Sequence, residues 1–418
     1  MRLVTPVLFV FCLFAHDLSA AEGTHWVATW AASPSIQNPD PAAMRTRKLE
    51  FVNQTVREIV HTSIGGDTVR IKLSNVFGPQ PVNVAATHIA LSAPGWAASA
   101  GALTAASAPG GIVAGSDRVL TFSGKPTVSI LPGALVLSDP VKLPVAVLGD
   151  LAISLYFSDA TMTTTLHYSA QQNSYVASGD ETSAVTLTEP QAVTSWAFLT
   201  AVDVLAPEST GLIVAFGDSI TDGARSTNDA NHRWPNFLAN RLITPKGPNR
   251  FAVVDAGIGG NKIISDATGR NIAYGVNALA RLERDALAQA GVKYLLLLEG
   301  INDLSSNASV EDLVAAMKQI IERCHENGVK VIGGTITAAE RAGARVNGLS
   351  DRETRRLALN DWIRKGKAFD GYVDFDKATE DPAQPGVMLA AYDSGDHLHP
   401  NDAGYQAMGA AVDLALFQ

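Results

Sequence analysis

The sequence predicts an α/β fold for its second half, built on a parallel sheet, and an all-β sandwich or jelly-roll-like fold for its first half. Near residue 207 the hydrophobic pattern changes from short runs with a period of two to compact apolar runs that alternate with helical segments. The chain of 418 residues is also long enough for two cores, because a single core seldom grows beyond about 250–300 residues. We therefore expect a β-domain at 24–206 and an α/β domain at 210–418.

Short strands are expected through the first of these regions. Apolar and polar residues alternate from Val69 to Leu73, and the same period returns from Leu151 to Phe157. This alternation is typical of a strand with one face in water and the other in the core. Turn-forming residues, such as those at Gly65 to Asp67, separate the runs, and long amphipathic helices are absent from the pattern. These features favour a sandwich or jelly roll.

Five compact apolar runs in the second half predict strands that are buried on both faces. They are Leu212–Phe216, Phe251–Val254, Tyr294–Leu298, Val329–Ile332 and Tyr372–Phe375. Helices are expected between them, and Ser309 and Ser350 each stand before acidic residues as N-cap residues do. The alternation of strands and helices predicts right-handed βαβ units and a parallel sheet.

The first 21 residues are expected to be a signal peptide. Arg2 supplies a positive charge, Val7 to Ala15 is apolar, and small residues at Ser19 to Ala21 offer a cleavage point. The apolar run is too short to span a bilayer, which needs about 20 apolar residues. We therefore expect a secreted or periplasmic protein with no stable membrane insertion.

Composition excludes some partners and crosslinks. The formal charge of −9 provides no basic footprint for nucleic acid. Cys12 lies in the predicted signal peptide, so the mature chain would keep Cys324 alone and form no internal disulfide. Cys324 shares one helical face with apolar residues, which indicates a buried thiol.

Chemistry is expected at the carboxyl ends of the parallel strands, where open sheets bind their ligands. Ser219 follows the first of these strands, within Gly217-Asp218-Ser219. A serine on a tight turn can present its hydroxyl to a cleft, and a neighbouring glycine allows close approach. The alternative for this segment is an Asp-Ser helix cap.

Two further strand ends carry groups that can stabilise negative charge. Gly257 to Gly260 follow the second strand, where exposed backbone N–H groups would suit an oxyanion. Asn302 follows the third strand and offers a carboxamide donor. Taken separately, the first segment is better explained as a flexible turn and the second as an Asx turn.

The segment from Asp396 to Pro400 supplies a possible base and its partner. A serine hydroxyl reacts near neutral pH only when an imidazole accepts its proton and a carboxylate orients that imidazole. Asp396 stands three residues before His399 and can reach it within one loop, with His397 pointing elsewhere. The alternatives are an ordinary polar loop and a zinc site that uses Asp396, His397 and His399.

The order of these segments resembles that of the SGNH hydrolase family, also called GDSL esterases, over roughly residues 211–418. The matching blocks are Gly217-Asp218-Ser219, Gly257 to Gly260, Gly300-x-Asn302-Asp303 and Asp396-x-x-His399-Pro400. One departure is Ile220, where the family name implies leucine; we expect it to affect packing only. The resemblance implies a flavodoxin-like three-layer fold and an open, shallow active site.

The resemblance also implies roles for individual residues. Ser219 would be the nucleophile, His399 the general base and Asp396 its orienting carboxylate. The backbone N–H groups of Ser219 and Gly260 and the side chain of Asn302 would form the oxyanion hole. No metal or organic cofactor is required by this mechanism.

The first half, which contains the segment Trp26 to Pro34, resembles the β-domain of a subgroup of these enzymes associated with xylan and other carbohydrate esters. Trp26, Trp30 and Trp196 are expected in its core, with a sugar-binding platform as the alternative.

Together these features predict a secreted serine esterase that acts on short acyl esters, with acetyl esters of carbohydrate as the expected substrates. A lipid or aryl esterase, a lysophospholipase, a carbohydrate-binding surface protein and a metal-dependent hydrolase are the alternatives. The expected partner is a small-molecule or polysaccharide ester, and nothing in the sequence specifies an oligomeric state.

Overall fold

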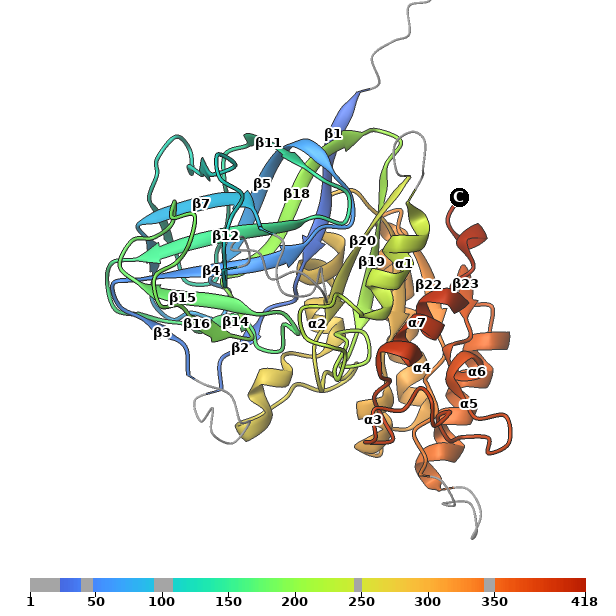
Figure 1. The fold of residues 1–418 in the computed structure, drawn as a ribbon. Coiled ribbons are helices and arrows are strands. Elements are labelled where there is room, and N and C mark those ends of the chain that lie inside the picture. The colour runs from blue at the N-terminus through green and yellow to red at the C-terminus, as the bar shows by residue number, and fades with distance from the viewer. Residues whose placement is uncertain (1–22, 39–47, 94–107, 244–249, 342–349) are drawn as a thin grey trace, which may run out of the picture.

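The computed structural model describes residues 23–38, 48–93, 108–243, 250–341 and 350–418. An all-β half and an α/β half lie side by side, as Figure 1 shows. The predicted signal peptide and its Cys12 lie outside the described residues. Among the helices that the structure describes, none combines the length and apolar character needed to cross a membrane.

The first half contains two large antiparallel sheets. The first has the order β1 (Thr24–Ala31), β18 (Leu199–Pro207), β5 (Gly66–Ser74) and β10 (Leu135–Leu137), with β11 (Val141–Val145) also paired to β5. The second has the order β16 (Gln191–Val193), β15 (Ser174–Ser178), β4 (Gln54–His61), β12 (Asp150–Phe157), β7 (Ala86–Leu91) and β8 (Arg118–Val119). Side chains from both sheets fill one core, among them Ile71 and Leu155, which are fully buried. The all-β prediction is confirmed.

Short strand pairs complete this half of the molecule. They are β17 (Trp196–Ala197), β14 (Thr165–His167) and β2 (Ser35–Ile36) in one sheet, β13 (Thr161–Met162) with β3 (Glu50–Phe51), and β6 (Val82–Val84) with β9 (Val128–Ile130). The residues that follow β14 reach the other half of the molecule, where Tyr168 contacts Gly259.

The second half is built on a five-stranded sheet in which every pair is parallel. Its order is β20 (Phe251–Gly257), β19 (Gly211–Gly217), β21 (Val292–Leu298), β22 (Lys330–Gly334) and β23 (Gly371–Val373). Numbered within this half, the order is 2-1-3-4-5, which is that of flavodoxin-like folds. The predicted parallel sheet is confirmed, and β19, β21 and β22 are largely buried on both faces. The prediction of two buried faces is wrong for β23, because this strand lies at the edge of the sheet and its Tyr372 is exposed.

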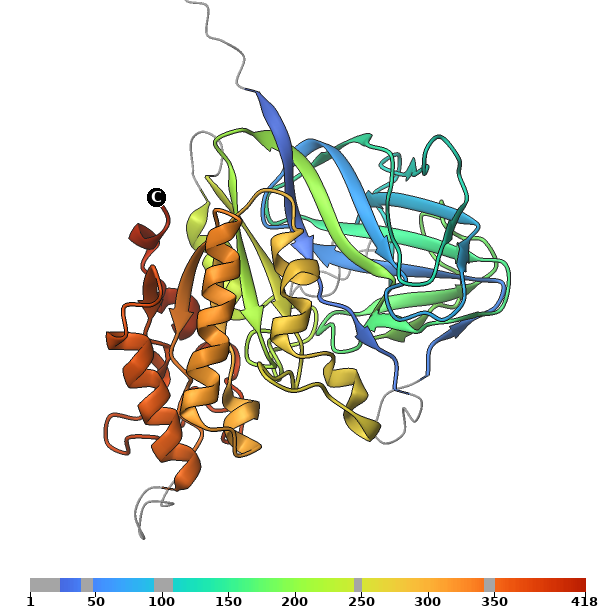
Figure 2. The same cartoon turned by 180° about the vertical axis from the view of Figure 1, so that it is seen from behind.

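Helices cover both faces of this sheet. One face carries α1 (Trp234–Leu242), α7 (Asp402–Ala411) and α6 (Phe375–Thr379) (Figure 1). The other face carries α2 (Ala278–Leu282) and α4 (Val310–Glu326), and α5 (Asp351–Lys365) packs on α4 (Figure 2). A short α3 (Ile301–Ser305), a 3₁₀ helix η3 (Gly269–Tyr274), a π turn η4 (Glu283–Leu287) and a 3₁₀ turn η6 (Leu414–Leu416) complete the helices of the described residues. The three-layer fold is thus confirmed.

Local signals set most of the element boundaries. The Ser309 hydroxyl accepts from the Asp312 N–H at 3.1 Å, and Ser350 caps α5 through the Glu353 N–H at 3.1 Å, as predicted. The predicted strand Tyr372–Phe375 is too long: β23 stops at Val373. The reason is that the Asp374 side chain accepts from the Lys377 N–H at 3.2 Å and starts α6 instead.

The two halves share a continuous core and a hydrogen-bonded contact. The Ala28 N–H donates to the Ala290 carbonyl at 3.0 Å, and the Val253 N–H donates to Ser63 Oγ at 3.1 Å. Trp30 and Trp196 are buried with their rings edge-to-face at 4.9 Å. They therefore belong to the core, as expected, and form no exposed sugar platform.

Candidate active site

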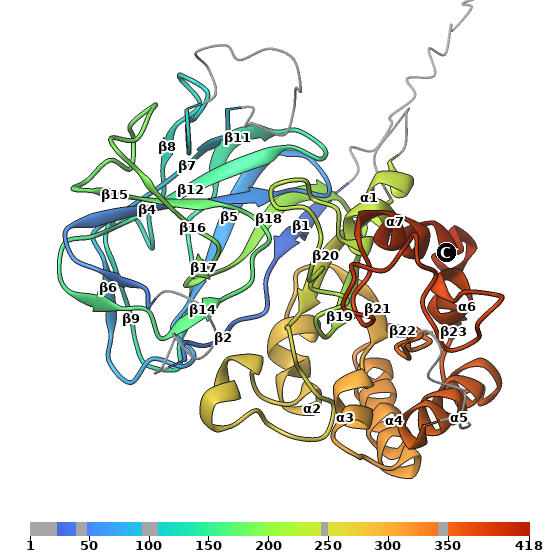
Figure 3. The same cartoon turned by 60° about the horizontal axis from the view of Figure 1, so that its bottom comes forward.

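The loops that follow β19, β20 and β21 meet at one edge of the parallel sheet, which Figure 3 turns forward. Ser219 lies two residues beyond the end of β19, and the residue is 8% exposed. A Cβ on Gly217 would lie 2.2 Å from the Leu298 carbonyl oxygen, so glycine is needed for these strand ends to approach. Asp218 is buried and its carboxylate accepts from the Ile220 N–H at 3.0 Å, which stabilises the turn. Burial raises the pKa of Asp218 to about 7.

The structure brings the three predicted triad residues together. Ser219 Oγ lies 2.8 Å from His399 Nε2, and His399 Nδ1 lies 2.8 Å from Asp396 Oδ2. The other Asp396 oxygen accepts from the backbone N–H groups of Leu398 at 3.0 Å and His399 at 2.8 Å. The carboxylate therefore holds both the loop and the imidazole, and it can fix the tautomer that leaves Nε2 free to take a proton from Ser219.

The electrostatics of Asp396 suit this role. Partial burial by itself raises its pKa, but the backbone N–H and the imidazole of His399 outweigh that effect and hold the pKa well below the usual carboxyl range. Arg225 Nε approaches the same carboxylate at 3.2 Å from a more exposed position. Asp396 is consequently an anion at any pH at which such an enzyme would be assayed.

His397 is directed away from Ser219, as expected. Its Nδ1 lies 2.6 Å from Asp393 Oδ2, and its φ of 63° turns the loop between the two histidines. Within the described ranges, no group of three or more His, Cys, Asp or Glu side chains is placed to hold a metal ion. The ligand set that the zinc hypothesis needs is therefore not assembled in this loop.

Three donors face the same cleft as the Ser219 hydroxyl. Neither the Ser219 N–H nor the Gly260 N–H has a hydrogen-bond partner among the described residues. The Asn302 amide donates one hydrogen to the Asn261 carbonyl at 2.9 Å and has a second to offer. Ser219, Gly260, Asn302 and His399 all line one cleft of about 540 Å³. The arrangement can hold an oxyanion beside the serine hydroxyl.

A buried arginine that the sequence analysis missed joins the strand ends beneath these donors. Arg281 is fully buried and donates to the carbonyls of Ala256 at 2.7 Å and Gly217 at 2.8 Å. It also donates to Asn261 Oδ1 at 2.8 Å and lies 3.3 Å from the buried Glu299 carboxylate. No local signal marks an arginine on a short helix for this position, because its partners lie at or just beyond the ends of three strands, β19, β20 and β21, that are separate in the sequence.

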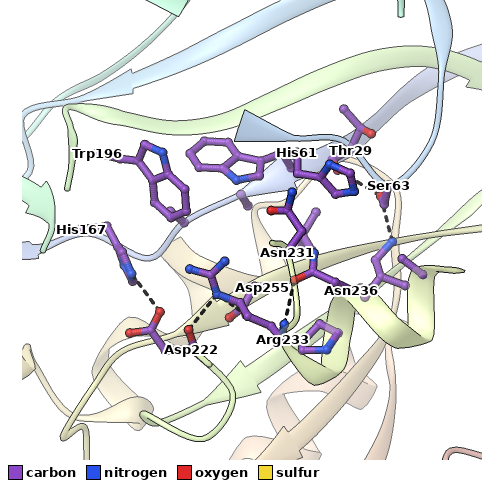
Figure 4. Close-up of a pocket in the computed structure, with 17 residues that line it drawn as sticks. Thr29, His61, Ser63, His167, Trp196, Asp222, Asn231, Arg233, Asn236 and Asp255 are labelled. Atoms are coloured by element: carbon purple, nitrogen blue, oxygen red, sulfur yellow. Dashed lines mark hydrogen bonds and ion pairs between the residues drawn. The ribbon is translucent and has the colours of Figure 1, made fainter. Parts of the chain in front are cut away.

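A second group of missed residues comes from the β half. Tyr168 and Ser169, which follow β14, line the cleft together with Tyr274 of η3. Next to them, His167 Nε2 lies 3.0 Å from Asp222 Oδ1 (Figure 4). The β half thus forms one wall of the candidate active site. No local sequence signal identifies these residues, since Tyr168 lies about fifty residues from Ser219 in the chain.

Comparisons with known proteins place a known family in the α/β half of the chain. Residues 215–407 match the model of the GDSL-like Lipase/Acylhydrolase family. None of the curated proteins compared with the chain matches it significantly.

Among solved structures, the chain is similar to a GDSL-like lipase from Bacteroides thetaiotaomicron, with 20% identity, a TM-score of 0.35, and coverage of 49% of this chain and 87% of that one. It is also similar to a variant of an acetyl-xylooligosaccharide esterase from Geobacillus Stearmophilus, with 20% identity, a TM-score of 0.37, and coverage of 49% and 92%.

The α/β half of the chain is a hydrolase domain with a strand-end serine and its cleft. Residues 215–407 of this half form a GDSL-like lipase/acylhydrolase domain, and the protein is a carboxylic ester hydrolase.

Proposed function

We propose that the protein cleaves short acyl esters, and specifically acetyl esters of carbohydrates, through an acyl-enzyme on Ser219. The observation that carries this proposal is the pair of 2.8 Å contacts that joins Ser219 to His399 and His399 to Asp396 at the base of an open cleft. A hydroxyl, an imidazole and a carboxylate in this arrangement are the parts that acyl transfer to serine needs.

In the first half of the reaction, Ser219 Oγ attacks the acyl carbon while its proton passes to His399 Nε2. The carbonyl π electrons move to the oxygen, which becomes an oxyanion. When this intermediate collapses, the bond from the acyl carbon to the alcohol oxygen breaks, and His399 gives its proton to the departing alcohol. In the second half, water attacks the acyl-Ser219 carbon while its proton passes to His399. The bond from that carbon to Ser219 Oγ then breaks, His399 returns the proton to Oγ, and the carboxylic acid is released.

The oxyanion would be stabilised by the N–H groups of Ser219 and Gly260 and by the amide of Asn302. These donors are held in place before the reaction, because Asn302 is tied to the Asn261 carbonyl and the Asp303 carboxylate accepts from the Ile263 N–H at 2.9 Å. Donors that need no rearrangement stabilise developing charge most effectively.

The lining of the cleft supports a polar alcohol and a short acyl group. Apart from the triad and the oxyanion donors, most of its residues carry hydroxyl, amide or charged groups: Ser169, Lys262, Ser265, Asp266, Thr268, Asn271, Ser305 and Ser306. Apolar side chains are few there, namely Ala224, Ala267 and Leu398, and two tyrosines offer ring faces. A long acyl chain would find no continuous apolar wall, whereas sugar hydroxyls would find hydrogen-bond partners.

Export is part of the proposal, since the first 21 residues carry a predicted signal peptide. An exported acetyl esterase would meet polysaccharide outside the cytoplasm.

The test is hydrolysis of a substrate panel by the mature protein and by Ser219→Ala. The panel contains p-nitrophenyl acetate, p-nitrophenyl esters of longer acids and acetylated xylan. Activity on the acetyl substrates that disappears in Ser219→Ala, with rates falling as the acyl chain lengthens, is the expected result. Activity that survives in Ser219→Ala would overturn the serine mechanism, and a preference for long acyl chains would overturn the carbohydrate assignment in favour of a lipid ester.

A fluorophosphonate probe provides an independent check of the nucleophile. The phosphorus centre should lose its fluoride and bond to Ser219 Oγ, which mass spectrometry of the labelled peptide would locate. Ser394→Ala is the matched control, because it removes a serine hydroxyl from the loop that carries Asp396 and should leave labelling intact.

A further inference from the structure

The two peptide units that flank the Gly259 Cα are held by side chains from both halves of the molecule. The Gly259 N–H donates to Asp222 Oδ2 at 3.1 Å. The Gly259 carbonyl accepts from the hydroxyl of Tyr168, which comes from the β half, at 3.0 Å. The Gly259 carbonyl and the Gly260 N–H belong to one planar trans peptide, so they point in opposite directions. A hydrogen bond that fixes the carbonyl therefore also fixes the direction of the Gly260 N–H.

We propose that Tyr168 is a positioning residue for the oxyanion hole, through which the β half aims the Gly260 N–H at the reacting ester. This inference rests on the proposed function, because it assigns Tyr168 to the oxyanion site described above. It gives the β half a part in the chemistry beyond forming a wall of the cleft.

The packing around both glycines supports this role. A Cβ on Gly259 would lie 2.7 Å from the Tyr168 hydroxyl, so only glycine lets the hydroxyl come so close. A Cβ on Gly260 would lie 2.4 Å from the ring of Tyr274, and Gly260 has a φ of +78°. Two tyrosine rings, with centroids 6.5 Å apart, thus enclose this short stretch of backbone. The peptide is confined by contact as well as by hydrogen bonds.

Tyr168 is itself fixed. Its carbonyl accepts from Ser195 Oγ at 2.9 Å, and the adjacent His167 is buried. His167 Nδ1 faces the Ser33 carbonyl at 3.0 Å while Nε2 faces Asp222, as Figure 4 shows for the latter pair. Both contacts are with acceptors, so the imidazolium form satisfies both.

The ionisation of these side chains favours the same arrangement. Burial lowers the pKa of His167, but Asp222 and the Ser33 carbonyl outweigh burial and raise the pKa above its ordinary value. Burial, with the nearby Asp222 charge, raises the pKa of the Tyr168 hydroxyl well above its ordinary value, so the hydroxyl remains a donor. Donation to the Gly259 carbonyl also polarises the peptide and strengthens its N–H as a donor.

The variant Tyr168→Phe removes the hydroxyl and keeps the ring. The matched control is Tyr156→Phe, which removes another tyrosine hydrogen bond of the β half, the 2.7 Å contact with Asn53, away from the cleft. Removal of an oxyanion donor costs about 10²–10³ in kcat; here the donor remains but is less well aimed, so we expect a loss of about 10- to 100-fold. KM should stay within about 2-fold, because the interaction acts in the transition state.

A second readout separates positioning from general loosening of the fold. A short alkyl boronic acid accepts an electron pair from the serine oxygen and becomes a tetrahedral anion, so it imitates the intermediate. Its affinity should weaken in Tyr168→Phe by about the same factor as kcat/KM, while the thermal midpoint changes no more than in Tyr156→Phe. The inference would be overturned if Tyr168→Phe had the same kcat and the same affinity for the boronic acid as Tyr156→Phe. It would also be overturned if kcat fell in Tyr168→Phe while its affinity for the boronic acid stayed at the wild-type value.

These outcomes are distinct from failure of the proposed function. If the wild-type protein shows no ester hydrolysis that depends on Ser219, the proposed function fails and the inference fails with it. If the wild-type protein is active and Tyr168→Phe behaves like the control, the inference alone is wrong.

Discussion

Replacing Arg281 by methionine should destabilise the protein strongly, because methionine keeps the approximate length of the side chain but none of its charge or donors. The guanidinium is fully buried and donates to the carbonyls that end β19 and β20. It is also the hydrogen-bond partner of the buried Glu299 carboxylate, whose second oxygen has no partner among the described residues. Asp285 would keep its pair with Arg284 at 2.9 Å, whereas Glu299 would lose its cation.

The expected loss of stability follows from the fact that Glu299 loses its cation. Removing one member of a buried ion pair costs about 3–5 kcal/mol, since the remaining charge is left without compensation. We therefore expect Arg281→Met to lower the free energy of unfolding by about 3–5 kcal/mol near pH 8. The control is Arg323→Met, which breaks a pair with Glu283 at the surface and should cost only about 0–1 kcal/mol.

The loss of unfolding free energy in Arg281→Met should also depend on pH. Burial raises the pKa of Glu299 well above its ordinary value and Arg281 opposes this, so loss of Arg281 raises the pKa further. At a pH between the pKa of Glu299 in the folded wild type and its higher pKa in the folded variant, only the variant holds a proton on Glu299. The deficit of Arg281→Met grows as pH rises through that interval, so it should not be larger near pH 5 than near pH 8.

Urea titrations of the wild type, Arg281→Met and Arg323→Met at both pH values measure these quantities. A deficit for Arg281→Met of less than about 1 kcal/mol near pH 8 would refute the reasoning, because that value is typical of an exposed pair. A deficit that grows toward acid pH would contradict the part assigned to Glu299.

Three further predictions concern the site and the core. Asn302→Ala should lower kcat by about 10²–10³ with little change in KM, and full activity in steady-state assays would remove Asn302 from the oxyanion hole. Asp396→Asn should lower kcat by on the order of 10⁴, whereas Arg225→Ala, which removes the exposed partner of the same carboxylate, should have a small effect. Because the pKa of Asp396 is depressed in the folded state, its stabilising effect is fully present above the ordinary carboxyl pKa and is lost as the pH falls below that value. The unfolding free energies of wild type and Asp396→Asn should therefore converge progressively as the pH falls below about 4. Cys324 is fully buried, and burial raises its pKa to about 12. Iodoacetamide should therefore modify Cys324 only after the protein unfolds. Rapid modification of the native protein, detected by mass spectrometry, would contradict this prediction.

Much of the site could be predicted because its signals are local. Asp396 and His399 stand three residues apart and make their contact within one loop. Ser219 and Asn302 follow compact apolar runs, and parallel strands deliver their carboxyl ends to one edge of the sheet. Even where a boundary was wrong, as at Phe375, the cause was a competing local signal, the cap at Asp374.

The sequence by itself therefore determined the strand and helix pattern, the parallel sheet and the order of the reacting residues, since each depends on periodicity or on neighbours along the chain. Only the tertiary structure decided which distant side chains hold the reacting groups in place. Arg281 joins the ends of two strands, and Tyr168 reaches Gly259 across the contact between the two halves. Such contacts depend on how packed elements dock, which no short stretch of sequence specifies.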